Sequence, residues 1–472
     1  MISPGAQSKA AWLAAASVLV CLTLGCGRSR VPSSSATLDA EADQYLRLAV
    51  ALGERDPDSL DYYYGPPGLV ADIRKQPPSL AEIGRSAKIL AQRVNSRRSQ
   101  SGIQAARQQY MVRQLLSIAG RVDVLTGEPM SFDHETEAVF GVKVPSAYDR
   151  GEMARARKEL DRLLPGRGNL AARYAAYDAK FMVPRDKVRL VFDTAIAGCR
   201  AATTAHVKLP PGEAIEVEYV RDRPWGAYSF YKGNYRSVVQ VNMDFGLTVD
   251  RALQLACHET YPGHHAYNSL QEEKLVRGSA MKEFAAQPTY SPQSMTSEAA
   301  ATLAVNVAFP AEERLRFERD ALFPQAGLKS REAAHYLKVE ALVEELHPAE
   351  AAIARDYLDG RLEFERANEA LDKEALMTHG EVALKYINEY RSYVATYTYG
   401  RDLAASYLNE PAFDGKHKIS WTRYSRWMTG PPVAMDAAGS GNPVDRNSVE
   451  FRTSVGLNAD GPQAAKREHP VL

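Results

Sequence analysis

Residues 257–265, Cys-His-Glu-Thr-Tyr-Pro-Gly-His-His, constrain the fold of this 472-residue chain more than any other stretch. They combine residue types that bind metals with a proline and a glycine that interrupt a helix. On an unbroken helix, His258 and His264 would stand about 9 Å apart along the axis and about 240° apart around it, too far to bind one ion. Pro262 lacks a backbone donor, and Gly263 tolerates backbone angles closed to other residues. We therefore predict that the helix breaks between the two histidines and brings the second one back toward the first.

The same stretch contains the components of a catalytic zinc site. Helical zinc hydrolases bind the metal through two histidines and carry a glutamate beside the first. We predict His258 and His264 as ligands and Glu259 as the general base that accepts a proton from metal-activated water. His265 is an alternative second ligand, because it returns to the face of His258, but its rise of about 10.5 Å also requires the break. Ligand geometry favours His264.

A catalytic zinc ion usually has three protein ligands, so one more must come from elsewhere in the chain. Glu272 and Glu273 are near in sequence but lie on the continuation of the first helix and would face away from the ion. Glu298 lies near the start of a later apolar helix that could lie against the first one, and we predict it as the third ligand. Without the upstream motif, Glu298 would be interpreted as a first-turn glutamate favoured by the helix dipole.

The pattern of the rest of the chain predicts a mainly α fold with a small antiparallel β-sheet, a zincin-like helical metallopeptidase architecture with a central cleft, over residues 37–430. Ser79 and Glu82 form a capping box before an apolar 3–4 repeat. The other helices expected in the first half are 38–53, 102–125, 150–164, 168–180 and 187–205. Residues 212–247 alternate as strands, 248–310 would hold the metal site, and long charged helices fill 310–405.

The predicted sheet lies directly before the His-Glu helix. In zinc peptidases, an edge strand beside the metal commonly binds an extended substrate as an added strand. The alternative is a hairpin that only caps the helical body. The aromatic loop 61–67 is interpreted as a surface turn, and we assign it no chemistry.

The N-terminus has the pattern of an export signal. Lys9 precedes an apolar run over residues 10–24, which is too short to span a membrane. Leu22-Thr23-Leu24-Gly25-Cys26 resembles a bacterial lipobox, so we predict a lipoprotein signal peptide over 1–25 and a lipidated Cys26. The alternative is an ordinary signal peptide cut nearby. Residues 26–36 are predicted to be a flexible tether and 431–472 a disordered tail. The expected location is the bacterial cell envelope, facing the periplasm or the cell surface, with the lipid anchor as the only membrane attachment.

Charge and cysteine content limit which partners the protein can bind and which disulfides it can form. Lys plus Arg equals Asp plus Glu at 58 each, and no basic patch is interleaved with aromatic residues, so we expect no nucleic-acid partner. Two of the four cysteines, Cys21 and Cys26, lie in the targeting segment. Only Cys199 and Cys257 could pair in the mature chain, and the favoured interpretation is two buried unpaired thiols.

The His-Glu-x-x-Pro-Gly-His-His run is accompanied by Glu218-Tyr219, Pro224-Trp225 and Val241-Asn242-Met243-Asp244. Together these motifs resemble the bacterial proteins grouped as domain of unknown function 885, and the resemblance covers most of residues 40–430. It implies a gluzincin-like, mostly helical metallopeptidase with a cleft and zinc. It also implies the same site as above, with ligands His258, His264 and Glu298 and base Glu259.

A late segment both follows and departs from that family. Tyr397-Thr398-Tyr399-Gly400 matches its Tyr-x-x-Gly, which implies Tyr397 as a contact to the oxyanion or the substrate. Arg391-Ser392-Tyr393 stands where the family tends to carry Pro-Gly-Gln, a departure that bears on substrate preference.

The function predicted from these features is an exported, lipid-anchored zinc peptidase with one catalytic ion and a peptide substrate. The alternative is a non-catalytic envelope lipoprotein that keeps the fold and binds peptides or partners. A metal hydrolase acting on a non-peptide amide or ester is a third option. The residues predict no preference among amino-, carboxy- and endopeptidase activity, and no oligomeric state.

Overall fold

The computed structural model describes residues 34–97, 102–146, 150–223, 225–411 and 417–430. The predicted signal peptide, Cys26, most of the tether and the 431–472 tail lie outside the described residues. Helix α1 begins at Ser34, so the last three positions of the predicted tether are helical instead. The mainly helical class with a small sheet is confirmed.

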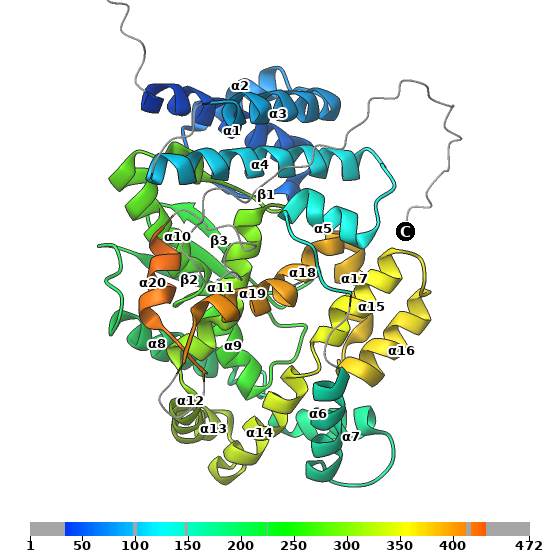
Figure 1. Cartoon of the computed structure of the whole chain (residues 1–472). Coiled ribbons are helices and arrows are strands. Elements are labelled where there is room, and N and C mark those ends of the chain that lie inside the picture. Colours follow the sequence, from blue (N-terminus) through cyan, green and yellow to red (C-terminus); the bar gives the residue numbers. More distant parts are fainter. Residues whose placement is uncertain (1–33, 98–101, 147–149, 224, 412–416, 431–472) are drawn as a thin grey trace, which may run out of the picture.

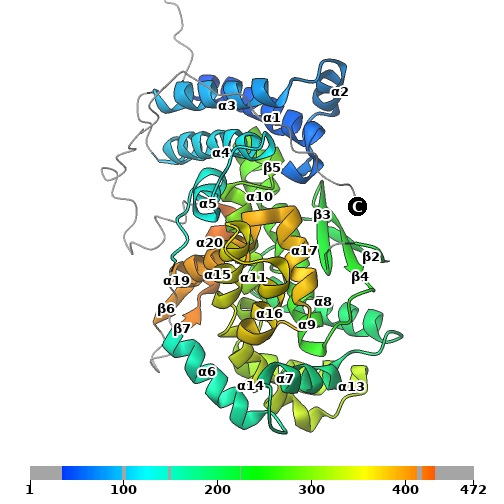
Figure 2. The ribbon, with the colours of Figure 1, turned by 90° about the vertical axis from the view of Figure 1, so that its right-hand side faces the viewer.

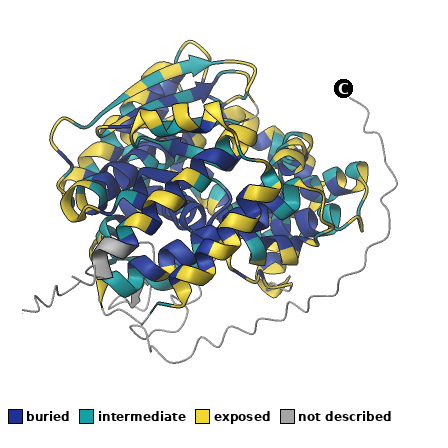
Figure 3. Cartoon of the chain, turned by 90° about the horizontal axis from the view of Figure 1, so that it is seen from above, coloured by how far each residue is buried: buried dark blue, intermediate teal, exposed yellow. Residues whose placement is uncertain are grey.

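Four N-terminal helices form a layer across the top of Figure 1. They are α1 (Ser34–Arg55), α2 (Pro67–Lys75), α3 (Leu80–Asn95) and α4 (Ile103–Leu125). The predicted capping box of α3 is confirmed, because Ser79 accepts from the backbone of Glu82 while the Glu82 carboxylate accepts from the backbone of Ser79. Figure 3, seen from above, shows buried and exposed residues alternating along these helices, as expected for a layer with one solvent-exposed face. Their apolar faces pack with residues 275–286 into a core of their own.

The remaining helices build the body below this layer, around a second and larger apolar core. They are α5 (Phe132–Phe140), α6 (Arg150–Leu163), α7 (Leu170–Asp178), α8 (Val188–Thr204), α9 (Val249–Glu259), α10 (His264–Gln271), α11 (Pro292–Ala308), α12 (Ala311–Phe317), α13 (Phe323–Ala326), α14 (Ala333–Glu344), α15 (Pro348–Leu358), α16 (Phe364–Ala375), α17 (Gly380–Tyr390), α18 (Val394–Tyr397), α19 (Tyr399–Leu408) and α20 (Trp421–Thr429). Helices therefore occupy all five of the predicted stretches in the first half.

Three strands form the small sheet on the right of Figure 2, β2 (Ala214–Val220), β3 (Ala227–Gly233) and β4 (Arg236–Asn242). Their order is β2-β4-β3, and β2 runs parallel to β4, so the prediction of a wholly antiparallel sheet is wrong. The reason is the loop after β2, which passes the end of β4. The side-chain amide of Asn242 donates to the carbonyls of Arg223 and Trp225, at 2.8 and 3.1 Å, and holds this loop in place.

Two short strand pairs complete the described β structure. Strand β1 (Leu60–Tyr63) pairs with β5 (Ala286–Pro288), and β6 (Asn409–Pro411) pairs with β7 (His417–Ile419). The aromatic loop is therefore partly a strand, which attaches the N-terminal layer to the segment leading into α11. Within the described residues, no helix combines the length and the apolar character needed to cross a membrane.

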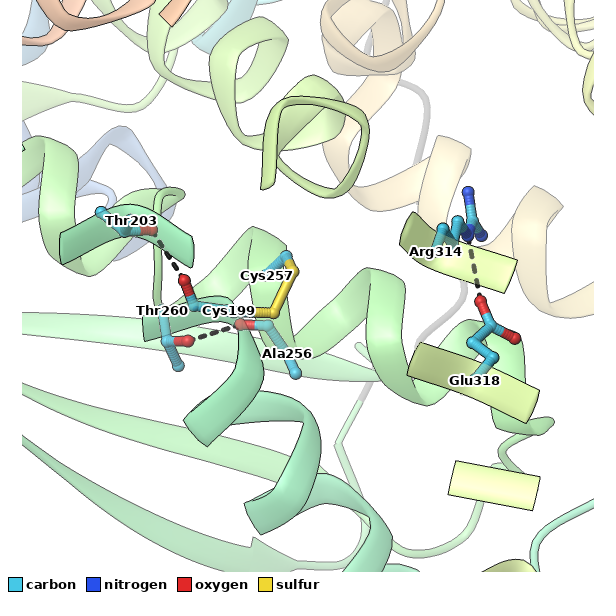
Figure 4. Close-up of a disulfide and its surroundings, with 7 residues drawn as sticks. All are labelled: Cys199, Thr203, Ala256, Cys257, Thr260, Arg314 and Glu318. Carbon is cyan, nitrogen blue, oxygen red and sulfur yellow. Dashed lines mark hydrogen bonds and ion pairs between the residues drawn. A yellow bond between two sulfur atoms is a disulfide. The ribbon is translucent and has the colours of Figure 1, made fainter. Parts of the chain in front are cut away.

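Cys199 and Cys257 form a disulfide, so the expectation of two free thiols is wrong. Cys199 lies on α8 and Cys257 on α9, and these helices pack closely enough to bring the two Cα atoms to 5.5 Å, within the range that a bridge requires. Figure 4 shows the bond joining the two helices, one residue before His258. The bridge thus fixes α8 to α9.

Candidate metal centre

The predicted helix break lies between His258 and His264. Helix α9 ends at Glu259, the Tyr261–Pro262 peptide bond is cis, and α10 begins at His264. Gly263 makes the reversal possible, because a Cβ there would lie only 1.8 Å from the carbonyl oxygen of His258. Its backbone N–H donates to the carbonyl of Cys257 at 3.0 Å. Glycine is therefore required where the chain folds back on its own preceding turn.

The break brings the two histidines and Glu298 together. Nε2 of His264 lies 3.1 Å from Nε2 of His258, and Oε2 of Glu298 lies 3.3 and 3.4 Å from these two nitrogens. Ligand atoms about 2.1 Å from a tetrahedral zinc ion stand about 3.4 Å from one another. The three donor atoms are therefore spaced like three corners of such a tetrahedron. Within the described parts of the chain, no other group of three metal-ligating side chains comes this close.

The bonding state of these atoms also fits a cation between them. Oε2 of Glu298 is buried and accepts no hydrogen bond of acceptable geometry, although two imidazoles are adjacent. Nδ1 of His264 lies 3.2 Å from the hydroxyl of Ser297, which can fix the tautomer whose Nε2 lone pair points at the site. The two imidazoles and the carboxylate, with solvent reaching His258 and His264, are the donor types of catalytic zinc.

Glu298 is carried by the central helix α11, which packs against α9 and lies beside it in Figure 1. Helix α11 is rich in small buried side chains, which allow neighbouring helices to approach closely; they are Ala299, Ala300, Ala301 and Ala304. Tyr393 fixes the other carboxylate oxygen, because its hydroxyl donates to Oε1 of Glu298 at 2.8 Å. Sequence reasoning missed this role, since Tyr393 stands in the segment that departs from the family pattern.

Protonation in the metal-free site follows from these contacts. Burial disfavours the charged form of His264, but the negative charge of Glu298 outweighs it and raises the pKa of His264 to about 9. Burial likewise opposes ionisation of Glu298, yet the positive charge of His264 holds the pKa of Glu298 well below its ordinary value. An ion-pair of this kind shows that the carboxylate is poised to balance a cation at this position.

Glu259 lies beside the three donors without joining them. Its carboxylate is buried and makes no hydrogen bond among the described residues. Burial raises the pKa of Glu259, and the charges of His258 and His264 partly counter this. A carboxylate that is unbonded and more basic than usual is suited to take up a proton.

The alternative second ligand, His265, points into the protein on the opposite side of α10. Its Nδ1 lies 2.8 Å from the Ser237 hydroxyl and its Nε2 3.0 Å from a carboxylate oxygen of Glu213. His265 is fully buried, and both of its ring nitrogens have protein partners. The geometry thus separates it from the three donors, in agreement with the preference for His264.

Tyr397 lies at the edge of the site, with its ring centroid 6.3 Å from that of His258. Its hydroxyl is 3.2 Å from the hydroxyl of Tyr386. Burial raises the pKa of Tyr397 well above its ordinary value, so its phenol stays neutral and can donate. The side chain is half-buried, so solvent reaches it beside His258.

Asp61 is a charged residue near the site that sequence reasoning assigned to a loop without chemistry. It accepts from the Tyr228 hydroxyl and from the Gln287 side chain, the latter at 3.0 Å. Burial raises its pKa to about 6, while the Tyr228 hydrogen bond and the charge of His264 lower it. An acidic residue within an aromatic run was the sequence feature that could have drawn attention to Asp61. Its position near His264, however, results from the pairing of β1 with β5.

The second His-Glu pair, His134-Glu135, is not part of this centre. Glu135 instead accepts from Arg391 and from the backbone and hydroxyl of Ser392. It thereby holds the segment that carries Tyr393. The interpretation of this pair as unrelated to the metal motif agrees with its position.

Comparisons with known proteins do not assign the chain to a family. No family model matches it, and no curated protein matches it. One solved structure that it resembles is an M32 carboxypeptidase from Deinococcus radiodurans R1, at 16% identity and a TM-score of 0.30, over 79% of this chain and 85% of that chain. A similarity this remote gives no basis for carrying over an activity.

Proposed function

We propose that this protein is a zinc-dependent peptidase that hydrolyses peptide bonds. The observation that supports this most directly is the 3.1–3.4 Å spacing of donor atoms from His258, His264 and Glu298, with the unbonded carboxylate of Glu259 beside them. A zinc ion bound there would polarise the scissile carbonyl and lower the pKa of a water molecule. The motif's resemblance to the proteins of domain of unknown function 885 is part of this proposal.

The chain's own residues have distinct tasks in this reaction. Glu259 accepts a proton from the attacking water and delivers it to the leaving amine. Tyr393 and Ser297 hold Glu298 and His264 in orientation through their hydroxyl groups. Tyr397 donates its neutral hydroxyl to the oxygen that gains negative charge.

We also propose that the protein is exported and anchored to the bacterial cell envelope through a lipid on Cys26. The Cys199–Cys257 disulfide supports this location, because disulfides persist in oxidising compartments and are rare in the cytosol. Mass spectrometry of the purified mature N-terminus tests the anchor. A chain that begins elsewhere than at a diacylated Cys26 would contradict it.

Metal analysis and peptide digestion test the activity. The mature protein is expected to bind about one zinc ion and to cleave a peptide library in a chelator-sensitive manner. Glu259→Gln should retain the zinc ion and lose cleavage by about 10²–10⁴-fold. A zinc-loaded protein that cleaves no peptide would instead favour a non-catalytic binding lipoprotein. Cleavage that survives in Glu259→Gln would refute the assigned mechanism.

A further inference from the structure

Three tyrosines that solvent reaches form a continuous row that begins beside the metal ligand His258. The ring centroid of Tyr397 lies 6.3 Å from that of His258. Next come Tyr386, 6.3 Å from Tyr397, and Tyr390, 4.6 Å from Tyr386. All three side chains are half-buried, and solvent also reaches the imidazole of His258. We call Tyr386, Tyr390 and Tyr397 the tyrosine row, and it adjoins the side of the metal centre that is open to solvent.

The turn after α17 brings the three rings together. Tyr386 and Tyr390 stand four residues apart on α17 and therefore share one face of that helix. The helix ends at Arg391, whose φ of +52° is unusual for a residue with a side chain. Glu135 holds this residue by accepting from its guanidinium at 2.7 Å. The chain then enters α18, where the hydroxyl of Tyr397 comes to 3.2 Å from that of Tyr386. One fixed turn thus places rings from two helices side by side.

The tyrosine row offers neutral aromatic faces rather than charge. Burial raises the pKa of all three phenols above its ordinary value, so none is ionised at neutral pH. Arg391, the cation next to the row, is paired with Glu135. Tyr393 supports the row from the buried side, with its ring 6.3 Å from that of Tyr390 and 5.8 Å from that of Tyr397. Rings held in this way suit contact with apolar and aromatic groups.

We propose that the tyrosine row is the specificity site of the peptidase and binds an aromatic or large apolar side chain of the substrate. A peptide whose scissile carbonyl lies at the metal has its neighbouring side chains within reach of the row, because the first ring adjoins His258. An extended peptide advances about 3.3–3.6 Å per residue, so the side chain bound there belongs to one of about three residues nearest the scissile bond. Offset or edge-on contact with the tyrosine rings favours an aromatic side chain over alanine.

This inference rests on the proposed peptidase activity and is tested with octapeptides built from alanine and serine. One series carries a single phenylalanine at each position in turn, and the parent peptide carries none. With the zinc-loaded mature protein, kcat/KM for the best phenylalanine peptide should exceed that for the parent by about 10–100-fold, as expected from burial of a phenyl group. Mass spectrometry should place the cleaved bond within about three residues of the phenylalanine.

Tyr390 is the most informative position for substitution, because its ring contacts Tyr386 and Tyr393 and lies two rings away from His258. Tyr390→Ala should lower the ratio of kcat/KM between the phenylalanine peptide and the parent by about 5–10-fold, since one aromatic face is lost. Tyr390→Phe should keep the ratio, because it keeps the ring. The double variant Tyr386→Ala/Tyr390→Ala should bring the ratio close to one.

Tyr357→Ala is the matched control. Tyr357 is another half-buried tyrosine against α17, where its hydroxyl donates to the Asn388 side chain at 2.8 Å, and it is not part of the row. Its removal should leave the ratio unchanged, and zinc content and thermal unfolding report whether each variant folds. A ratio that persists in Tyr390→Ala and in the double variant would overturn the proposal.

The wild-type protein alone provides a second test. Equal cleavage of the phenylalanine peptides and the parent would also overturn the proposal but leave the peptidase assignment intact. No cleavage of any peptide by the zinc-loaded protein would reject both.

Discussion

His264 and His265 are consecutive residues that serve two different regions of the molecule. His264 lies on the side of α10 that solvent reaches, which we call the front region and define by His258, His264 and Glu298. There its Nε2 lies beside Nε2 of His258 and the unbonded Oε2 of Glu298. His265 lies on the buried side, which we call the back region and define by His265, Ser237 and Glu213. It is fully buried, and its ring nitrogens contact Ser237 and Glu213. Both histidines have partners for both ring nitrogens, so the difference lies in those partners: Nε2 of His264 faces a second imidazole and the unbonded Oε2 of Glu298, whereas His265 lies among core side chains.

The back region is held together by one carboxylate. Glu213 accepts from His265, from the Tyr261 hydroxyl at 2.6 Å and from the guanidinium of Arg200. Because Tyr261 and His265 flank the turn at Gly263, this network fixes the reversal that delivers His264 to the front. The hydrogen bonds of Glu213 thus help to set the backbone shape that brings His264 next to His258 and Glu298.

Alanine substitution of the two histidines should separate these roles most clearly. His264→Ala is expected to lose the zinc ion and reduce peptide hydrolysis by at least about 10³-fold, since a ligand is removed. His265→Ala should keep the zinc ion but lower the free energy of unfolding by about 2–3 kcal/mol, because it leaves buried partners unsatisfied. Metal analysis, peptide hydrolysis and urea unfolding measure the three quantities. Metal loss in His265→Ala, with metal retained in His264→Ala, would reverse our assignment.

Removal of the disulfide tests how firmly α9 must be held for the front region to form. The bridge joins residues 58 positions apart, for which the chain-entropy relation gives about 4 kcal/mol of stabilisation. The double variant Cys199→Ala/Cys257→Ala should therefore unfold at lower urea, by about 3–4 kcal/mol, and bind zinc more weakly. The wild-type protein treated with a reductant should behave like the variant, and the variant should not respond to the reductant. Equal stability of the oxidised and reduced wild-type protein would contradict this expectation.

Features governed by neighbouring residues could be predicted from the sequence. The capping box at Ser79 and Glu82 depends on a four-residue contact, and the helix break depends on how Gly263 folds against the carbonyl of His258. Glu298 could be nominated because catalytic zinc usually has three protein ligands, although it lies in the second turn of α11, which begins at Pro292, and not in its first turn as the sequence suggested. In each case the determining interaction is short-range or is dictated by the chemistry of the ion.

Features that depend on distant packing could not be predicted. The parallel pairing of β2 with β4 depends on how Asn242 holds a loop, and the disulfide depends on how closely α8 approaches α9. Asp61 reaches the site only because β1 pairs with a segment more than two hundred positions later in the chain. No periodicity or spacing encodes such contacts, since each is decided by which helix or strand faces which.

The contribution of Glu213 to the free energy of unfolding should depend on pH, and this effect is smaller than those of the histidine and cysteine variants. Burial opposes ionisation of Glu213, but the hydrogen bonds from His265, Tyr261 and Arg200 outweigh it and lower its pKa to about 2. Because the folded pKa lies below the ordinary value, this group stabilises the fold above about pH 4.5 and loses that contribution as pH falls toward 2.

Glu213→Gln should therefore be less stable than the wild-type protein by about 2 kcal/mol at pH 7, with the difference shrinking between pH 5 and pH 3. Urea unfolding at a series of pH values measures this gap. Glu381→Gln, which removes a carboxylate paired with Lys385 on the exposed surface, is the control and should show no measurable gap at any pH. If the difference in free energy of unfolding between Glu213→Gln and the wild-type protein stays constant down to pH 3, the packing of the Glu213 side chain, and not its charge, is responsible for the difference. The back region would then support the metal site through packing alone.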